Sequence, residues 1–319
     1  MFILVIQVKT QGFFMVEKNI ENKILSLKES KDVIILAHNY QIPEIQDIAD
    51  FVGDSLDLAL KATKTDTKNI IFCGVDFMAE SAKILNPEKN VIIPDINAKC
   101  PMAAMVDSES LSYMKEKNPD ADVVTYINTT ADVKAISDIC CTSSNGVKIV
   151  KSRTTKKIIF VPDRNLGLYI KRFTPDHEMI IWQGVCPTHH NITKEEILKI
   201  KNKHPNSKIL VHPECKPDVI DIADYVFSTN GMVNFVKKSK DMEFIIGTEE
   251  GLCHRLKKEN PEKNFFSLES AICPNMKKIT LKKVLNSLET LKPKIKLSDN
   301  IMKKAKLPLQ RMMDVGRGD

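Results

Sequence analysis

Short, wholly apolar runs recur along the chain and alternate with stretches whose apolar residues follow a helical period. Runs of this kind are typical of strands covered on both faces, which occur in parallel sheets with helices above and below. The pattern therefore predicts an α/β fold. The predicted strands cover residues 33–36, 69–73, 91–93, 122–126, 158–160, 179–182, 208–211, 243–246 and 264–267.

Particular residues mark the expected helix boundaries. Pro43 suits the first turn of a helix that Gly53 is expected to end. Ser55 is expected to cap the helix that follows it, and a further helix is expected to open near Ser143. The chain from residue 280 to 291 resembles the leading helix of the preceding units and begins a segment that is expected to close over them.

The same landmarks return at a nearly constant interval, which indicates an internal repeat. Cys100, Cys186 and Cys273 are each followed by proline, and they lie 86 and 87 residues apart. We therefore predict three copies of one unit. Two further sets share this period, one at strand ends and one of hydroxyl-bearing residues: His38, Tyr126 and His212, and Ser55, Ser143 and Ser228.

The repeat predicts three α/β domains, with the active site at the centre where the units meet. Their predicted ranges are 17–104, 105–190 and 191–276. Residues 1–16 form an N-terminal extension in this scheme, and residues 277–319 form a C-terminal helix and closing tail.

Composition narrows the class of protein. The net charge is +6, but the lysines are scattered and aromatic residues are only 6% of the chain, so a nucleic-acid surface is not expected. No apolar run approaches the roughly 18 residues that span a bilayer, and no basic leading region marks a signal peptide. Eight cysteines without a secretion signal favour reduced thiols and a cytoplasmic location.

The three Cys-Pro cysteines are candidate metal ligands. A structural zinc site usually takes pairs of ligands that are close in sequence, and no Cys-x-x-Cys pair exists here. Three single thiolates suit a [4Fe–4S] cluster with one iron left free to bind substrate as a Lewis acid. The alternative is that Cys100, Cys186 and Cys273 are inert buried residues beside turn prolines.

The other five cysteines have different expected roles. Cys73 ends an apolar strand and is expected in the core, and Cys253 is expected to be structural. Cys140 and Cys141 adjoin a polar turn and are alternative cluster ligands. Cys215 follows Glu214 near the expected centre.

Polar side chains lie just past the ends of several predicted strands, where ligands gather in parallel sheets. Ser55, Ser143, Ser228 and Thr229 are candidates for carboxylate or phosphate binding at helix starts, with simple N-capping as the alternative. The remaining candidates are anion donors or acid–base groups of the same centre, with His189 as a supporting residue: His38, Tyr40, Tyr126, Asn128, His212 and Glu214.

Several motifs resemble those of the quinolinate synthase A family, from about residue 17 to the end of the chain. The lysine at position 99 and the asparagine at position 39 depart modestly from the family pattern. The motifs are Ala-His-Asn-Tyr-Gln at 37–41, Asp-Ile-Ala-Asp-Phe-Val-Gly-Asp-Ser at 47–55, Met-Ala-Glu-Ser-Ala-Lys-Ile-Leu at 78–85, Tyr-Ile-Asn-Thr at 126–129, Cys-Thr-Ser-Ser-Asn at 141–145, Pro-Asp-Arg-Asn-Leu-Gly at 162–167 and His-Pro-Glu-Cys at 212–215.

The resemblance implies three α/β/α domains around a pseudo-threefold axis with a central active site. It also implies a transferase of NAD biosynthesis that condenses iminoaspartate with dihydroxyacetone phosphate to quinolinate, phosphate and water. It implies that Cys100, Cys186 and Cys273 ligate a [4Fe–4S] cluster, and that Tyr40 and Glu214 transfer protons. It also implies transient contact with the aspartate oxidase or dehydrogenase that supplies iminoaspartate. The implied substrate-binding residues are His38, Ser55, Tyr126, Asn128, Ser143, His212, Glu214, Ser228 and Thr229, with His212 also among the catalytic residues.

Two other classes of function stay open on the sequence. One is a different [4Fe–4S] dehydratase that acts on another dicarboxylate. The other is a non-enzymatic protein, either an iron–sulfur electron carrier or a zinc-stabilised binding module. A carrier normally saturates its irons with protein ligands, so three cysteines favour an enzyme over a carrier.

Overall fold

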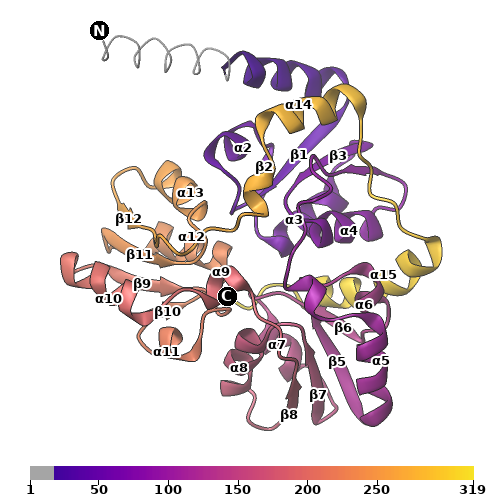
Figure 1. Cartoon of the computed structure of the whole chain (residues 1–319), viewed down its shortest axis with the longest axis vertical. Helices are drawn as coiled ribbons and strands as arrows, with labels where there is room; N and C mark the ends of the chain where they lie inside the picture. The colour runs from indigo at the N-terminus through magenta and orange to yellow at the C-terminus, as the bar shows by residue number, and fades with distance from the viewer. Residues whose placement is uncertain (1–17) are drawn as a thin grey trace.

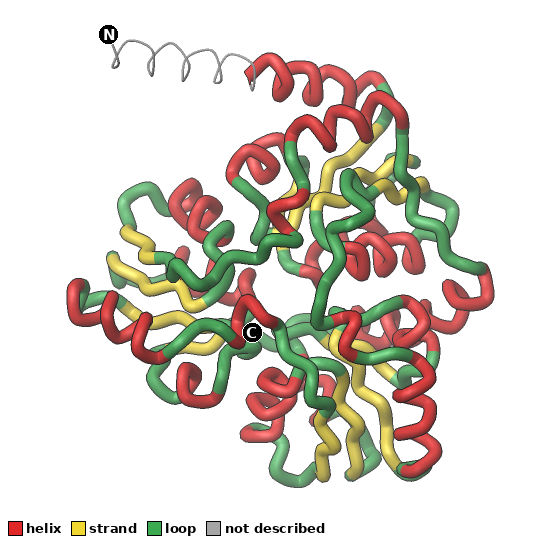
Figure 2. The backbone as a smooth tube through the Cα atoms, in the orientation of Figure 1, coloured by secondary structure: helices red, strands yellow, loops and turns green. Residues whose placement is uncertain are grey.

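The computed structural model describes residues 18–319, so the predicted extension over residues 1–16 lies outside the described part of the chain. Within that part, three parallel sheets of four strands each are arranged around a common centre, with helices packed against them (Figures 1 and 2). This arrangement confirms the prediction of three repeated α/β units. No helix between residues 18 and 319 is long and apolar enough to cross a membrane.

The three sheets have the same strand order. In each unit the first strand lies between the second and the third, and the fourth lies at the far edge, with every pair parallel. The strands are β1 (Val33–His38), β2 (Phe51–Gly53), β3 (Asn69–Cys73) and β4 (Asn90–Ile92); β5 (Ala121–Tyr126), β6 (Ile139–Cys141), β7 (Lys157–Val161) and β8 (Glu178–Ile181); and β9 (Lys208–Val211), β10 (Tyr225–Val226), β11 (Glu243–Gly247) and β12 (Asn264–Phe266).

The helices connect successive strands, and two more follow the third unit. The chain first forms a helix over residues 18–30. The others are α2 (Pro43–Ile48), α3 (Ser55–Lys64), α4 (Asp76–Leu85), α5 (Ser108–Lys117), α6 (Ala131–Ala135), α7 (Gly146–Lys151), α8 (Arg164–Arg172), α9 (Pro187–His190), α10 (Lys194–Lys203), α11 (Pro217–Ile220), α12 (Thr229–Lys238), α13 (Leu252–Glu259), α14 (Leu281–Thr290) and α15 (Asp299–Val315), with 3₁₀ turns η1 (Ala103–Met105) and η2 (Met276–Lys278).

The short second strand of each unit was not predicted, and the expectation that Gly53 ends a helix is wrong. Helix α2 ends at Ile48, and Gly53 instead ends strand β2. Strands β2, β6 and β10 have only two or three residues, too few to show an apolar run or a period. Their extended shape depends on pairing with the central strand, which is a tertiary interaction.

An aspartate completes the pairing of each central strand where the short strand does not reach. Strand β2 begins to pair at Leu36, and the preceding residue, Ile35, donates its backbone N–H to the Asp50 carboxylate over 2.8 Å. Asp138 and Asp224 make the same contact at 2.8 Å in the second and third units. The carboxylate therefore takes the place of a strand carbonyl and satisfies a backbone donor that would otherwise lack a partner.

The hydrophobic core is divided unequally among the units. The first two units share one continuous core with α14 and α15, and α15 packs against α4, α6 and β6. The second unit has one further cluster of its own. The third unit has two, built from residues between 192 and 271, which share no buried residue with the main core. Its position relative to the other two units therefore depends largely on contacts outside the main core.

We expect Asp138→Ala to lower the free energy of unfolding by about 1–3 kcal/mol, because the Val123 N–H loses its acceptor. Asp120→Ala is the matched control, since that side chain is 69% exposed and pairs with Lys157 only at 3.7 Å. Its expected cost is below about 1 kcal/mol. Urea unfolding followed by circular dichroism measures both, and equal costs would contradict the role given to Asp138.

Candidate active site

One cavity at the centre of the three units contains the predicted site residues. Ser228 is the exception, since it does not line this cavity and borders a neighbouring pocket instead. The structure therefore brings together residues that are far apart in the sequence. Those that line the cavity are Cys100, Cys186, Cys273, His38, Tyr40, Ser55, Tyr126, Asn128, Ser143, His212, Glu214 and Thr229.

The Cys-Pro dipeptide has the same local role in each unit. Each cysteine precedes a short helical turn: η1 after Cys100, α9 after Cys186 and η2 after Cys273. Proline suits the start of such a turn because its φ is fixed and its missing N–H would have no partner there. The next backbone N–H groups can then donate to sulfur, as those of Met102 and Ala103 do to Cys100.

Each cysteine is also held by a carboxylate from just past the third strand of its unit. The backbone N–H of Cys100 donates to Asp76 over 3.2 Å, that of Cys186 to Asp163 over 3.0 Å, and that of Cys273 to Glu249 over 3.1 Å. These three carboxylates lie 87 and 86 residues apart, so the repeat period itself contained the signal that would have identified them.

A second hydrogen bond attaches each cysteine loop to its unit. The carbonyl two residues before the cysteine, at Ala98, Gly184 or Ala271, accepts a backbone N–H from the carboxylate residue or its neighbour. The distances are 2.9, 2.7 and 2.9 Å. Each cysteine loop is therefore attached to its unit by the same pair of backbone contacts.

The thiols lie in an environment that disfavours their charged form. Burial raises the pKa of Cys100 to about 12, raises that of Cys186 well above its ordinary value and raises that of Cys273. No lysine or arginine is among the described residues that line the cavity. Hydrogen bonds from backbone N–H groups offset this rise in pKa only in part. The positive charge that would hold the cysteines as thiolates is therefore that of a bound metal.

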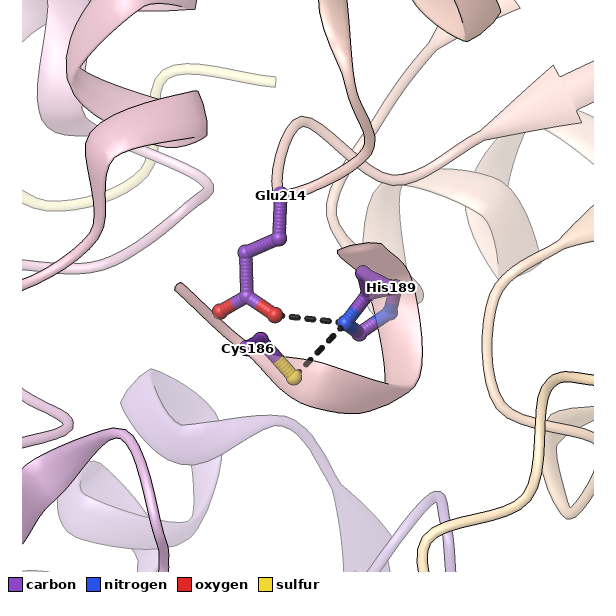
Figure 3. Close-up of side chains that lie close together, drawn as sticks. All are labelled: Cys186, His189 and Glu214. Atoms are coloured by element: carbon purple, nitrogen blue, oxygen red, sulfur yellow. Dashed lines mark hydrogen bonds and ion pairs between the residues drawn. The ribbon is translucent and has the colours of Figure 1, made fainter. Parts of the chain in front are cut away.

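Cys186, His189 and Glu214 form a close group on the cavity wall (Figure 3). His189 Nδ1 lies 2.6 Å from Glu214 Oε2 and 3.2 Å from Cys186 Sγ. One potential ligand atom from each residue lies within 4.8 Å of the others, so this group could hold a metal ion. The second oxygen of Glu214 is buried and has no protein partner among the described residues.

A chain of hydrogen bonds connects the two predicted acid–base residues. The Tyr40 hydroxyl lies 2.6 Å from Thr248 Oγ1, which lies 2.8 Å from His189 Nε2. His189 reaches Glu214 through its other nitrogen. Thr248 was missed on the sequence because a single threonine after a strand carries no distinctive pattern, although it directly precedes the carboxylate Glu249 of the repeated set.

Burial holds His38 and His212 in the neutral form. Burial lowers the pKa of His38 to about 4 and that of His212 to about 3, despite opposing charges that include Glu214. Burial also raises the pKa of Glu214, but His189 and His212 outweigh it and the net shift is downward. His38 Nδ1 accepts the backbone N–H of Tyr40 over 3.2 Å, so its proton is on Nε2.

The expected helix-start positions of the hydroxyls are correct for only part of the set. Ser228 caps α12, where its Oγ accepts the Gly231 N–H over 3.2 Å. Ser55 is the first residue of α3, as predicted, but the Asp54 carboxylate caps this helix instead. Ser143 does not start a helix, because α7 begins only at Gly146. Ser143 instead lies in a loop with its Oγ 3.2 Å from His212 Nε2.

The other cysteines do not line the cavity. Cys73, Cys140, Cys141 and Cys215 are buried in the hydrophobic clusters, as predicted for Cys73, and Cys253 is partly buried on α13. The structure therefore gives no support to Cys140 and Cys141 as alternative ligands. Both belong to strand β6, one of the short strands that the sequence did not predict.

We expect His38→Gln to flatten the pH dependence of stability in the metal-free protein. The unfolded chain binds a proton at His38 below about pH 6.5, whereas the folded chain does so only near pH 4. Protonation of His38 in the unfolded chain therefore lowers stability as pH drops through this window, by about 1.4 kcal/mol per pH unit. Urea unfolding between pH 6.5 and 5 measures the slopes, and identical slopes would refute this assignment.

Comparison with known proteins finds close similarity over nearly the whole chain. A family model described as Quinolinate synthetase A protein matches residues 22–314. The quinolinate synthase of Thermodesulfovibrio yellowstonii is 52% identical over 300 residues, which cover 94% of this chain and 99% of that protein. Quinolinate synthase 1 of Methanosarcina acetivorans is 49% identical over 302 residues, 94% of this chain and 99% of the relative.

Proposed function

Because this chain belongs to the quinolinate synthetase A family, we propose that it condenses iminoaspartate with dihydroxyacetone phosphate to form quinolinate, phosphate and water. The proposal includes a cytoplasmic role in NAD biosynthesis, with iminoaspartate supplied by an aspartate oxidase or dehydrogenase. The observation that carries it is the meeting of three equivalent Cys-Pro turns at one cavity that also contains the predicted acid–base residues.

The donor set fits a [4Fe–4S] cluster held by Cys100, Cys186 and Cys273. The three thiols have equivalent loops and equivalent backbone anchors, which favours a group that takes three equal thiolate ligands. When bound, such a cluster with one iron free of protein ligands supplies a Lewis acid to the cavity. The group of Cys186, His189 and Glu214 favours a second candidate, a mononuclear zinc site.

Neutral donors would bind the anionic substrates. Iminoaspartate is a dicarboxylate and dihydroxyacetone phosphate carries a phosphate, and the cavity offers the imidazole of His38 and the hydroxyls of Tyr126, Ser143 and Thr229. Fixed donors in a buried cavity act in a low dielectric, where each hydrogen bond to an anion is stronger than in water. The neutral state of His38 agrees with a donor role through Nε2.

Two unpaired acceptors suit the nitrogen of the first substrate. Asn128 Oδ1 and one oxygen of Glu214 are buried without a protein partner among the described residues. A buried acceptor without a partner is costly, so such atoms commonly mark the place of a ligand donor. The N–H of iminoaspartate or of its condensed product would satisfy them, and this places Glu214 beside the atom that loses its proton.

Proton transfer would use the series of hydrogen bonds that runs from Tyr40 through Thr248 and His189 to Glu214. Isomerisation, dehydration and ring closure each move protons, and the tight contacts along this chain would let one end accept a proton while the other end donates one. His189 lies in the middle of this series of hydrogen bonds, since its two nitrogens face Thr248 and Glu214.

Serine substitutions test the cluster against the zinc site. We expect Cys100→Ser, Cys186→Ser and Cys273→Ser each to lose most of the iron and sulfide that the wild type holds after anaerobic reconstitution. Cys253→Ser is the control, because Cys253 lies on α13 away from the cavity, and it should retain them. Metal analysis and visible absorption measure the outcome. A zinc protein sensitive only to Cys186→Ser would contradict the cluster.

Activity tests the function directly. The anaerobic, cluster-loaded chain should form quinolinate from iminoaspartate and dihydroxyacetone phosphate, detected by chromatography. Tyr40→Phe should lower kcat by about a hundredfold at unchanged iron content, because the hydroxyl that begins the proton chain is removed. Tyr225→Phe, at an exposed tyrosine, should match the wild type. Fully loaded wild-type protein that makes no quinolinate would overturn the proposal.

A further inference from the structure

Residues 316–319 run into the centre of the molecule and contact all three units (Figure 1). Arg317 pairs with Asp54 of the first unit at 2.8 Å, and its other terminal nitrogen donates to Ser228 Oγ of the third unit over 2.9 Å. The backbone N–H of Gly318 donates to the Ser144 carbonyl of the second unit over 3.0 Å. We call this segment the clasp.

Each anchor of the clasp is a predicted substrate-binding hydroxyl or its neighbour in the chain. Asp54 directly precedes Ser55, Ser144 directly follows Ser143, and Ser228 is itself the third member and is next to Thr229. The clasp therefore ties together the three segments that carry the repeated hydroxyl set. The repeat alone could not predict this, because the tail has no counterpart within a unit.

Glycine residues allow the backbone path that the clasp follows. Gly316 has a φ of +70°, in the region that favours glycine, and it turns the chain away from the end of α15. A side chain at Gly318 would place its Cβ 2.8 Å from the Ser144 carbonyl oxygen, and one at Gly231 would lie 2.5 Å from Asp319. Glycine at both positions allows the close approach.

Charge also holds the clasp in place. The Arg317 guanidinium contacts the carboxylates of Asp54, Asp57 and Asp319, and its side chain is only 23% exposed. Asp319 in turn accepts the backbone N–H of Ser228 over 3.0 Å, at the start of α12. Several charge-assisted hydrogen bonds in a half-buried place are stronger than an exposed ion pair.

The position of the third unit depends more on polar contacts such as these than that of the other two units does. Its apolar clusters are separate from the core shared by the first two units, so polar contacts set much of its position. Besides the clasp, Asn39 donates to Thr229 Oγ1 over 2.8 Å, and Arg255 donates to Asn39 Oδ1 over 2.8 Å. Asn39 therefore contacts Thr229, the residue next to Ser228, which the clasp contacts.

We propose that residues 316–319 fix the relative positions of the three hydroxyl-bearing loops, and that Arg317 is a positioning residue for substrate binding. The identity of the substrate in this inference rests on the proposed function. The role of the clasp in positioning rests only on the contacts described above. A fixed arrangement lowers the entropy lost when a substrate bridges the three units, so its loss should weaken binding more than it slows the chemical steps.

The experiment compares Arg317→Ala, Arg317→Lys and the control Arg311→Ala in the cluster-loaded protein. Arg311 belongs to α15, the helix that precedes the clasp, and it donates to the Asp138 carbonyl of the second unit. For Arg317→Ala we expect the KM of both substrates and the Kd of quinolinate, measured by calorimetry, to rise about tenfold with kcat within about twofold of wild type. Arg317→Lys should give a smaller rise, and Arg311→Ala none.

Hydrogen exchange measured by mass spectrometry gives a reading that does not need activity. Peptides that contain residues 54–57 and 228–231 should exchange faster in both Arg317 variants and not in Arg311→Ala. Unchanged exchange in those peptides would overturn the clasp, as would a Kd that is unchanged or lowered in Arg317→Lys. Faster exchange in a protein that forms no quinolinate would support the clasp while refuting the proposed function.

Discussion

The hydrogen bond from each cysteine backbone N–H to a carboxylate of its own unit is the contact on which the centre of this molecule depends. It fixes a loop residue, which alone would be mobile, to the carboxyl end of a buried parallel strand. Because the three units share one strand order, the same contact made three times delivers three thiols to one cavity. The sheets therefore fix where the cysteines lie, because Asp76, Asp163 and Glu249 join each cysteine to the end of a strand.

The second constraint is electrostatic. The described lining of the cavity contains buried thiols, imidazoles and carboxyls but no lysine or arginine. Burial therefore sets the protonation states: it keeps His38 and His212 neutral and opposes ionisation of the cysteines. Glu214 keeps a low pKa because histidines surround it. In a site of this kind the neutral groups act as hydrogen-bond donors, and the cysteines keep their protons unless a positive charge is bound.

The sequence predicted the features that are repeated and local, and missed those that arise from packing. The central strands, the Cys-Pro period and the strand-end residues such as His38 were predicted, because each leaves a pattern in a few consecutive residues. Strands β2, β6 and β10 were missed since they exist only by pairing with a neighbour. Asp54 in place of Ser55 at the helix cap was missed because both residue types are good caps, and only the backbone decides which is in position.

The C-terminal segment supplies a connection that three consecutive units of one chain otherwise lack. Covalent links join the first unit to the second and the second to the third, but nothing in the repeat joins the third to the first. After the third unit the chain returns to pack α14 against the first, crosses with α15 onto the second, and ends against the third. This path closes the ring at the point where the hydroxyl loops meet, and it explains why a segment outside the repeat contacts all three units.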